Sequence, residues 1–295
     1  MDSRAEVLIR RFASAELRAE VVDSQSRPSR NPSRGIPRGD IFAMTILGSG
    51  RSERFQMNPG AEDNRTEVPN INRDERQLIL MVHEPVRTFT EQVSKGRATI
   101  DLRQVKVVGE TEFAWTIERK TSSVKRHFLC GTDERQYFIA QLPVPVTTVR
   151  QAHEVLRPQA VTNSKGKVVR QGEWFFVQPS TDEQAKLDSF LDSGSRRSLM
   201  LPAAIHVKVP IGPASMGRVM KRQFGGNPHI ADELVMLTQP LVAGAVASVT
   251  VFVRGSVRHV DHNTVRFPSW VKVFRNTERT DTGGVARMGG VSWID

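Results

Sequence analysis

The amino-acid sequence predicts an α+β fold built mainly from antiparallel β-hairpins, with three or four short helices and a flexible, basic N-terminal arm. Three observations support this prediction. Apolar runs bounded by turn-forming residues recur between Gln77 and Arg275. Short stretches with helical spacing and recognisable caps lie between these runs. Residues 1–76, by contrast, are mostly polar and rich in Arg, Ser and Pro.

The N-terminal arm is expected to cover residues 1–76. An amphipathic helix is predicted over residues 3–22, where Val7, Leu8 and Phe12 lie roughly on one face. Residues 23–40 mix Ser, Pro, Gly and Arg without apolar periodicity, so they can bury too little surface to offset the entropy lost on folding. We expect that segment to be disordered and the folded body to begin near Gln77.

The body is expected to span residues 77–275, as one α+β domain or as two subdomains, 77–195 and 196–275. Strands are predicted over residues 77–86, 97–108 and 113–119, because each run is apolar or β-branched. The clearest hairpin is residues 124–143, where two apolar runs flank a Gly-Thr-Asp-Glu-Arg tip. A short helix is expected next, capped by Thr147 or Thr148 and ended by Pro158.

Residues 168–177 are predicted to form a strand in which Gly172 marks a bulge or a close backbone approach. Ser180 and Glu183 form a capping box that begins a helix, and Gly194 is placed to end it.

The rest of the body is predicted from short local patterns. A strand over residues 204–209 is followed by helices over 213–224 and 228–237. Two apolar alternating runs, 248–259 and 264–275, predict a second hairpin. The Gly-rich residues 276–295 predict a mobile tail.

The charge of the chain predicts its partner. A formal net charge of +10 creates a positive field, which raises the local concentration of polyanions such as nucleic acid. We therefore predict a nucleic-acid-binding or assembly protein with sequence-tolerant phosphate contacts; a merely solvated basic surface is the alternative explanation. The candidate phosphate-binding residues lie in the arm, before the first hairpin and in the helix expected over 213–224: Arg27, Arg30, Arg34, Arg38, Lys120, Lys125, Arg126, Arg218, Lys221 and Arg222.

A group of histidines and carboxylates predicts an alternative function, a metal-dependent hydrolase or nuclease. Two histidines and a carboxylate lie within four positions at a strand end, and residues two apart on a strand face the same side. The sequence Pro-His-Ile-Ala-Asp-Glu would add ligands from one helix face. In this alternative one divalent metal ion is the cofactor, whereas the primary prediction needs none. Its candidate ligands are His229, Asp232, His259, Asp261 and His262. Asp-His-Asn is also common at hairpin tips, which is the competing structural explanation.

The single cysteine, Cys130, allows no disulfide within the chain and favours a reducing, cytoplasmic location. Its apolar surroundings favour a small core residue over a nucleophile with His127 or His206 as base. No apolar run reaches the ~18 residues of a bilayer-spanning helix, so no membrane contact is predicted. A structural subunit of a larger particle is a third functional class, oligomerisation is left open, and no residue is assigned as catalytic.

Overall fold

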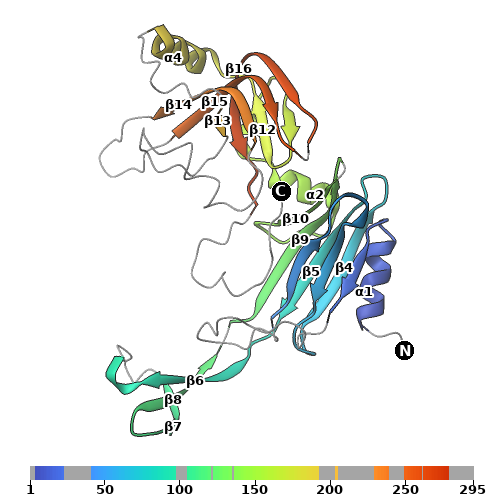
Figure 1. Ribbon diagram of the computed structural model, residues 1–295, viewed down its shortest axis with the longest axis vertical. Helices are drawn as coiled ribbons and strands as arrows, with labels where there is room; N and C mark the ends of the chain where they lie inside the picture. Colours follow the sequence, from blue (N-terminus) through green and yellow to red (C-terminus); the bar gives the residue numbers. More distant parts are fainter. Residues whose placement is uncertain are drawn as a thin grey trace. The chain divides into compact units, whose positions relative to one another are not determined.

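The computed structural model describes residues 4–22, 41–97, 105–120, 122–134, 136–192, 203–204, 229–238, 249–260 and 262–278. Within these ranges the protein is mixed and mostly β-sheet, with four α-helices and almost entirely antiparallel sheets (Figure 1). In the same ranges no helix has both the length and the apolar character needed to cross a membrane. The chain divides into two compact units, one made of residues up to 132 with 137–152, the other of 133–136 with 153–278, so the boundary falls inside helix α2 (Val149–Leu156).

Two sheets and one helix make up the centre of the first unit. The four-stranded sheet has the order β10-β9-β5-β4, with β4 at Arg65–Asn72, β5 at Gln77–Glu84, β9 at Val124–Asp133 and β10 at Gln136–Gln141. The three-stranded sheet has the order β1-β3-β2, with β1 at Ala19–Val21, β2 at Ala43–Leu47 and β3 at Arg54–Asn58. A short 3-10 turn, η3 (Gly50–Ser52), connects β2 and β3.

Helix α1 (Arg4–Ala13) completes this core because its two buried residues, Leu8 and Phe12, lie on one face. Phe12 packs edge-on against Phe55 of β3, with 5.1 Å between ring centroids, and Phe55 stacks on Tyr137 of β10. The same apolar cluster includes Leu80 and residues of β2 and β9. A third sheet of the first unit has the order β6-β8-β7, with β6 at Thr88–Ser94, β7 at Lys106–Glu110 and β8 at Ala114–Lys120, and a 3-10 turn, η4 (Lys95–Arg97), follows β6.

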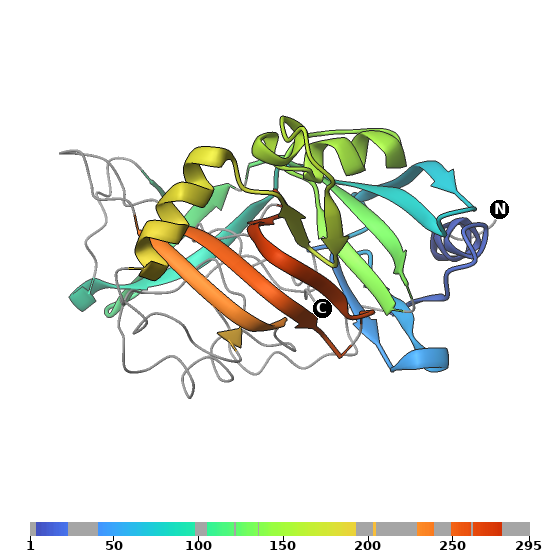
Figure 2. The same cartoon turned by 90° about the horizontal axis from the view of Figure 1, so that it is seen from above.

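The second unit is organised around one six-stranded antiparallel sheet. Its order is β11-β12-β16-β15-β14-β13, and the bounds are β11 Val169–Gln171, β12 Trp174–Val177, β13 Ala203–Ala204, β14 Ile230–Thr238, β15 Val249–Arg258 and β16 Val265–Arg275. One cluster of side chains on this sheet contains Trp174, Phe176, Val257 and Phe267. Helix α4 (Thr181–Asp192) packs through Leu187 onto a second cluster with Val235, Phe252 and Trp270 (Figure 2). The short helix α3 (Gln159–Thr162) adds Val161 to a third, with Phe175 and Val177.

Several local predictions are confirmed. The hairpins β9–β10 and β15–β16 form where turn residues separate two apolar runs. Helix α2 begins as predicted, because the backbone N–H of Gln151 donates to Oγ1 of Thr148. The capping box of α4 is also present: Ser180 N–H donates to Glu183, and Glu183 N–H donates to Oγ of Ser180.

Four predictions differ from the structure. The helix expected over residues 3–22 ends at Ala13, and Ala19–Val21 forms strand β1. Residues 228–237 were expected to be helical, but β14 occupies that stretch as a strand. Residues 168–177 form a two-stranded hairpin, β11–β12, and not a single strand. The arm was expected to be largely flexible up to residue 76, yet α1 and strands β1 to β4 contribute to the core. The strands β2 and β3 alternate strictly between buried and half-buried residues, so five residues each suffice to cover one face of the core.

Residues 23–40, most of 193–228 and the tail beyond 278 lie outside the described ranges. The disordered segment, the strand at 204–209, the helix at 213–224 and the Gly-rich tail therefore stay predictions.

Candidate metal centre

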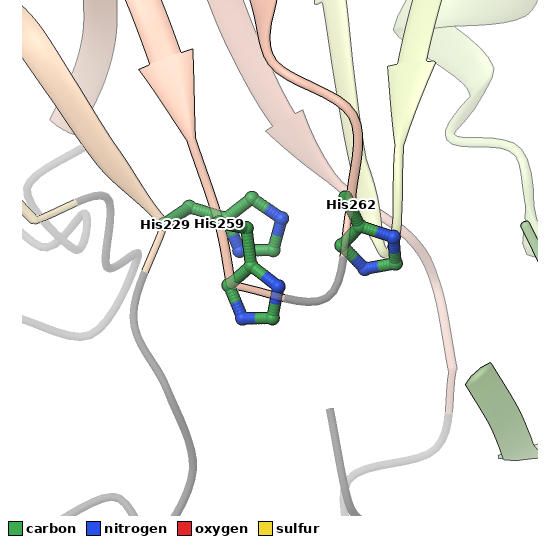
Figure 3. Close-up of side chains that lie close together, drawn as sticks. All are labelled: His229, His259 and His262. Atoms are coloured by element: carbon green, nitrogen blue, oxygen red, sulfur yellow. The ribbon is translucent and has the colours of Figure 1, made fainter. Parts of the chain in front are cut away.

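The second unit brings three histidines together at one end of its sheet. His229 precedes β14, His259 follows β15, and His262 lies in the connection between β15 and β16. Because Ile230 pairs with Arg258 across β14 and β15, His229 and His259 occupy the next opposed positions of the antiparallel pair. Their ring centroids are 4.2 Å apart, and His262 lies 4.9 Å from His259 and 5.5 Å from His229 (Figure 3).

The geometry of the three rings suits a metal ion. His229 and His259 are buried, with 2% and 7% of their surface exposed, and His262 is half-buried. One ring nitrogen from each histidine lies within 4.8 Å of the other two. Zinc–nitrogen bonds of ~2.0–2.1 Å at tetrahedral angles separate the ligand nitrogens by roughly 3.3 Å. The rings are stacked, with interplanar angles of 16°, 24° and 30°, so they would have to rotate for their in-plane lone pairs to point at one ion. Neutral imidazole is a ligand for zinc, copper, iron and nickel ions.

A tight turn of the β11–β12 hairpin closes over these rings. Gln171 pairs with Trp174 across the hairpin, which leaves Gly172 and Glu173 as its two central residues. Gly172 has φ +56, while Glu173 does not have a positive φ, the pattern of a type II′ turn, which prefers glycine at its first central position. A Cβ atom on Gly172 would lie 2.7 Å from Nε2 of His262 and 3.4 Å from Nε2 of His229. The close backbone approach predicted at Gly172 is therefore confirmed.

Polar atoms around this turn are buried without hydrogen-bond partners among the described residues. They are both ring nitrogens of His262, Oε1 of Gln171 and Nε1 of Trp174. A buried polar group without a partner costs about 1–3 kcal/mol, and a bound water molecule or ion would offset that cost. Trp174 lies edge-on to His229, with 6.3 Å between ring centroids.

One ion pair and two hydrogen bonds with backbone groups hold the turn and the neighbouring loop in place. Arg170 donates through Nε to the carbonyl oxygen of Gly172 at 2.8 Å, and its guanidinium pairs with Asp133 at 3.3 Å. On the other side of the site, the backbone N–H of Asn263, the residue after His262, donates to Glu134 at 2.7 Å. The loop that carries His262 and the turn that covers it are thus both fixed by residues of the second unit.

Of the five predicted metal ligands, the structure assembles three. Asp232 is not one of them, because its carboxylate accepts the N–H of Ser256 at 2.7 Å and pairs with Arg258. The Ser256 hydrogen bond and the nearby Arg258 guanidinium hold the pKa of Asp232 below its usual value. The helix expected over residues 228–237, which would have placed His229 and Asp232 on one face, is replaced by strand β14. Asp261 lies outside the described residues.

Only three of the predicted phosphate-binding residues lie within the described ranges: Lys120, Lys125 and Arg126. Lys120 and Lys125 are exposed. Arg126 is buried, and its guanidinium lies 2.6 Å from Glu84 and over the rings of Phe42 and Phe128. A guanidinium held in this way is not presented to a phosphate. Arg27, Arg30, Arg34, Arg38, Arg218, Lys221 and Arg222 lie outside the described residues, so their role in polyanion binding stays a prediction.

Cys130 is fully buried in the first unit, where its Sγ lies 4.0 Å from Sδ of Met44. Burial raises the pKa of this thiol far above its ordinary value. A thiol in this setting is a core side chain and a poor nucleophile.

Sequence reasoning did not identify Gln171 or Trp174 as part of the site. Gln171 lies 86 residues from Val257 and 92 from Asn263, the two residues whose carbonyl oxygens its Nε2 approaches. The isolated glycine at position 172 was the one signal of this contact. No protein-family model matches the chain, and neither does any curated protein or any solved structure.

Proposed function

We propose that the chain is a metal-dependent hydrolase of phosphate esters whose metal ion, of the zinc type, is held by His229, His259 and His262. The observation that carries this proposal is the convergence of three ring nitrogens, from three separate positions of the sheet, within 4.8 Å. Both nitrogens of His262 are buried without hydrogen-bond partners among the described residues, and a bound cation would occupy at least one of them.

Three protein ligands leave a place for water. Structural zinc sites are closed by four protein ligands, whereas catalytic sites have three and hold water in the fourth position. A zinc ion lowers the pKa of that water to about 7, so hydroxide is available at neutral pH. His229, His259 and His262 would hold the ion, and the ion would supply a water-derived nucleophile for the phosphorus atom. The P–O bond to the leaving group would break as the new P–O bond forms, and the leaving oxygen would take a proton from solvent.

The charge of the chain favours an anionic substrate. A net charge of +10 raises the local concentration of phosphate esters, including nucleic acid. Nucleic acid, the polyanion predicted as a binding partner, is itself a phosphate ester. On this proposal it belongs to the same chemical class as the substrate of the metal centre. An ester without charge would gain nothing from this field.

The proposal is tested by the hydrolysis of bis(p-nitrophenyl) phosphate and single-stranded DNA. Protein purified without an affinity tag is stripped with a chelator and reloaded with zinc. His262→Ala should lower kcat/KM by at least about 100-fold, since the open metal site is lost. His83→Ala is the matched control, because His83 lies in the first unit and contacts Ser123. Equal activity in the His262→Ala variant and the unaltered chain would refute the proposal.

A further inference from the structure

The side chain of Gln171 is buried beside the stretch of chain that carries two of the three histidines. Gln171 is 2% exposed and ends strand β11 directly before Gly172, the residue that touches His262 and His229. Its Nε2 donates to the carbonyl oxygen of Asn263 at 2.6 Å and approaches that of Val257 at 3.4 Å. These two carbonyls flank the stretch of chain that carries His259 and His262.

The hydrogen bonds of Gln171 also fix which end of its amide faces them. A reversed amide would place Oε1 against two carbonyl oxygens, so the NH₂ group must face Asn263 and Val257. Oε1 is then the remaining atom, and it is buried without a hydrogen-bond partner in the described part of the chain. A buried amide oxygen needs a donor, because its desolvation is otherwise uncompensated.

The neighbouring polar atoms do not provide that donor. The ring nitrogens of His262 and Nε1 of Trp174 are buried nearby on the same loop and hairpin, yet none of them bonds to Oε1 of Gln171 within the described structure. A cation bound at one ring nitrogen of His262 and carrying water would satisfy that nitrogen and Oε1 of Gln171 together. The imidazoles then serve as ligands, and the water donates its hydrogen to Oε1.

We propose that Oε1 of Gln171 accepts a hydrogen bond from the metal-bound water and orients it for attack. This inference rests on the proposed metal centre and adds the group that contacts the nucleophile. Hydroxide has one O–H bond, and when that bond points to Oε1 the lone pairs of the oxygen face the open side of the site. Substitution of a group that hydrogen-bonds to a metal ligand typically changes metal affinity or catalytic activity by about 10–100-fold.

Two substitutions distinguish the role of Oε1 as an acceptor from the role of the Gln171 NH₂ group in holding the loop. Gln171→Met and Gln171→Glu both remove the NH₂ group that contacts Asn263 and Val257, but only Glu keeps an oxygen acceptor. The probe is thiocyanate, which displaces metal-bound water, and its affinity is read from the visible absorption spectrum of the protein loaded with cobalt(II). Because one hydrogen bond to water is lost, Gln171→Met should bind thiocyanate about 2- to 10-fold more tightly than the unaltered chain. Gln171→Glu should bind it no more tightly.

Other results overturn the inference in recognisable ways. If both variants change thiocyanate affinity equally, or both lose cobalt while the unaltered chain binds it, Gln171 only holds the loop. If the unaltered chain binds no cobalt, the metal centre itself is wrong. If the variants fold poorly, a measurement on the unaltered protein still tests the proposal. On addition of one equivalent of zinc, the ¹³C resonance of the Gln171 side-chain carbonyl should shift downfield. An unmoved resonance, with the histidine resonances shifted, contradicts the proposal.

Discussion

Gly172 and His262 are so close that no other residue fits at position 172 without displacing the imidazole: a Cβ atom there would lie 2.7 Å from Nε2 of His262. The two residues are 90 positions apart in the chain. The turn of one hairpin and the connection of another thus enclose the same small space.

Gly172→Ala should weaken zinc binding by at least about ten-fold, because the methyl group occupies the space beside the ligand nitrogens. Alanine with φ +56 also costs about 1–2 kcal/mol in the folded state. Gly50→Ala is the matched control, since Gly50 has φ +53 but no atom within 4 Å of an added Cβ. Gly172→Ala should lose at least as much stability as Gly50→Ala in urea unfolding, because it adds the contact with His262, and only Gly172→Ala should lose zinc affinity by calorimetry. Equal zinc affinities would contradict the geometry of the site.

Asp232→Asn should leave metal binding intact and reduce stability in a pH-dependent way. The pKa of Asp232 is lowered in the folded protein, chiefly by the Ser256 hydrogen bond and by Arg258. A carboxyl group with a lowered folded pKa stabilises the protein above its unfolded pKa of about 3.9 and loses that contribution as the pH falls through the folded pKa. Urea unfolding of the two proteins should therefore differ at pH 6 and converge below pH 4. Loss of the metal from the variant would restore Asp232 as a ligand.

Cys130 should be unreactive in the native protein. Burial raises its pKa, so little thiolate exists at pH 8, and its Sγ is closed off from solvent. An aromatic disulfide reagent should titrate no thiol in buffer and one thiol per chain in 6 M urea. Rapid reaction of the folded protein would show that this side chain is accessible, contrary to its place in the core.

Lys125 and Arg126 are adjacent in sequence but should behave in opposite ways. Arg126→Ala leaves the buried carboxylate of Glu84 without its partner, which should destabilise the protein by about 3–5 kcal/mol in urea unfolding. Lys125→Ala, at an exposed position, should change stability by less than about 0.5 kcal/mol.

Lys125→Ala also tests the predicted binding of nucleic acid. If exposed lysines contact phosphates, this variant should lower the slope of log binding constant against log salt concentration by the amount expected for about one phosphate contact. Replacing Arg126 and Glu84 together by leucine should recover only part of the stability lost in Arg126→Ala, because the buried N–H of Phe42 then loses Glu84 as its acceptor. An unchanged salt dependence in Lys125→Ala would remove Lys125 from the phosphate-binding residues.

The elements predicted correctly depend on neighbouring residues. The capping box at Ser180 and Glu183 and the hairpin β15–β16 are each encoded within one short continuous stretch of the chain, so the sequence shows them directly. Strand β14 was mistaken for a helix for a specific reason. A bulge between Ala231 and Glu233 interrupts its alternation, so the buried residues 231, 234 and 235 have helical spacing.

The candidate site was predicted in part for the same reason. His259 and His262 are close in sequence, whereas His229 was included because it was expected to share a helix face with Asp232, and that stretch is strand β14. The Gln171 contact with Asn263 depends on how β11 packs in the sheet, and no pattern within β11 encodes it. Residues 1–76 were expected to form a largely flexible arm because most of that segment is polar. The short strands β2 and β3 nevertheless bury every second side chain.

The central claim is that His229, His259 and His262 bind one metal ion, and elemental analysis of untagged protein purified without chelators tests it most directly. The account predicts about one zinc-type ion per chain in the unaltered protein, and little metal in the His259→Ala variant at equal folded content by circular dichroism. The His83→Ala control should keep the full amount. Metal-free unaltered protein that also binds no added zinc, or a His259→Ala variant with undiminished metal, would contradict it.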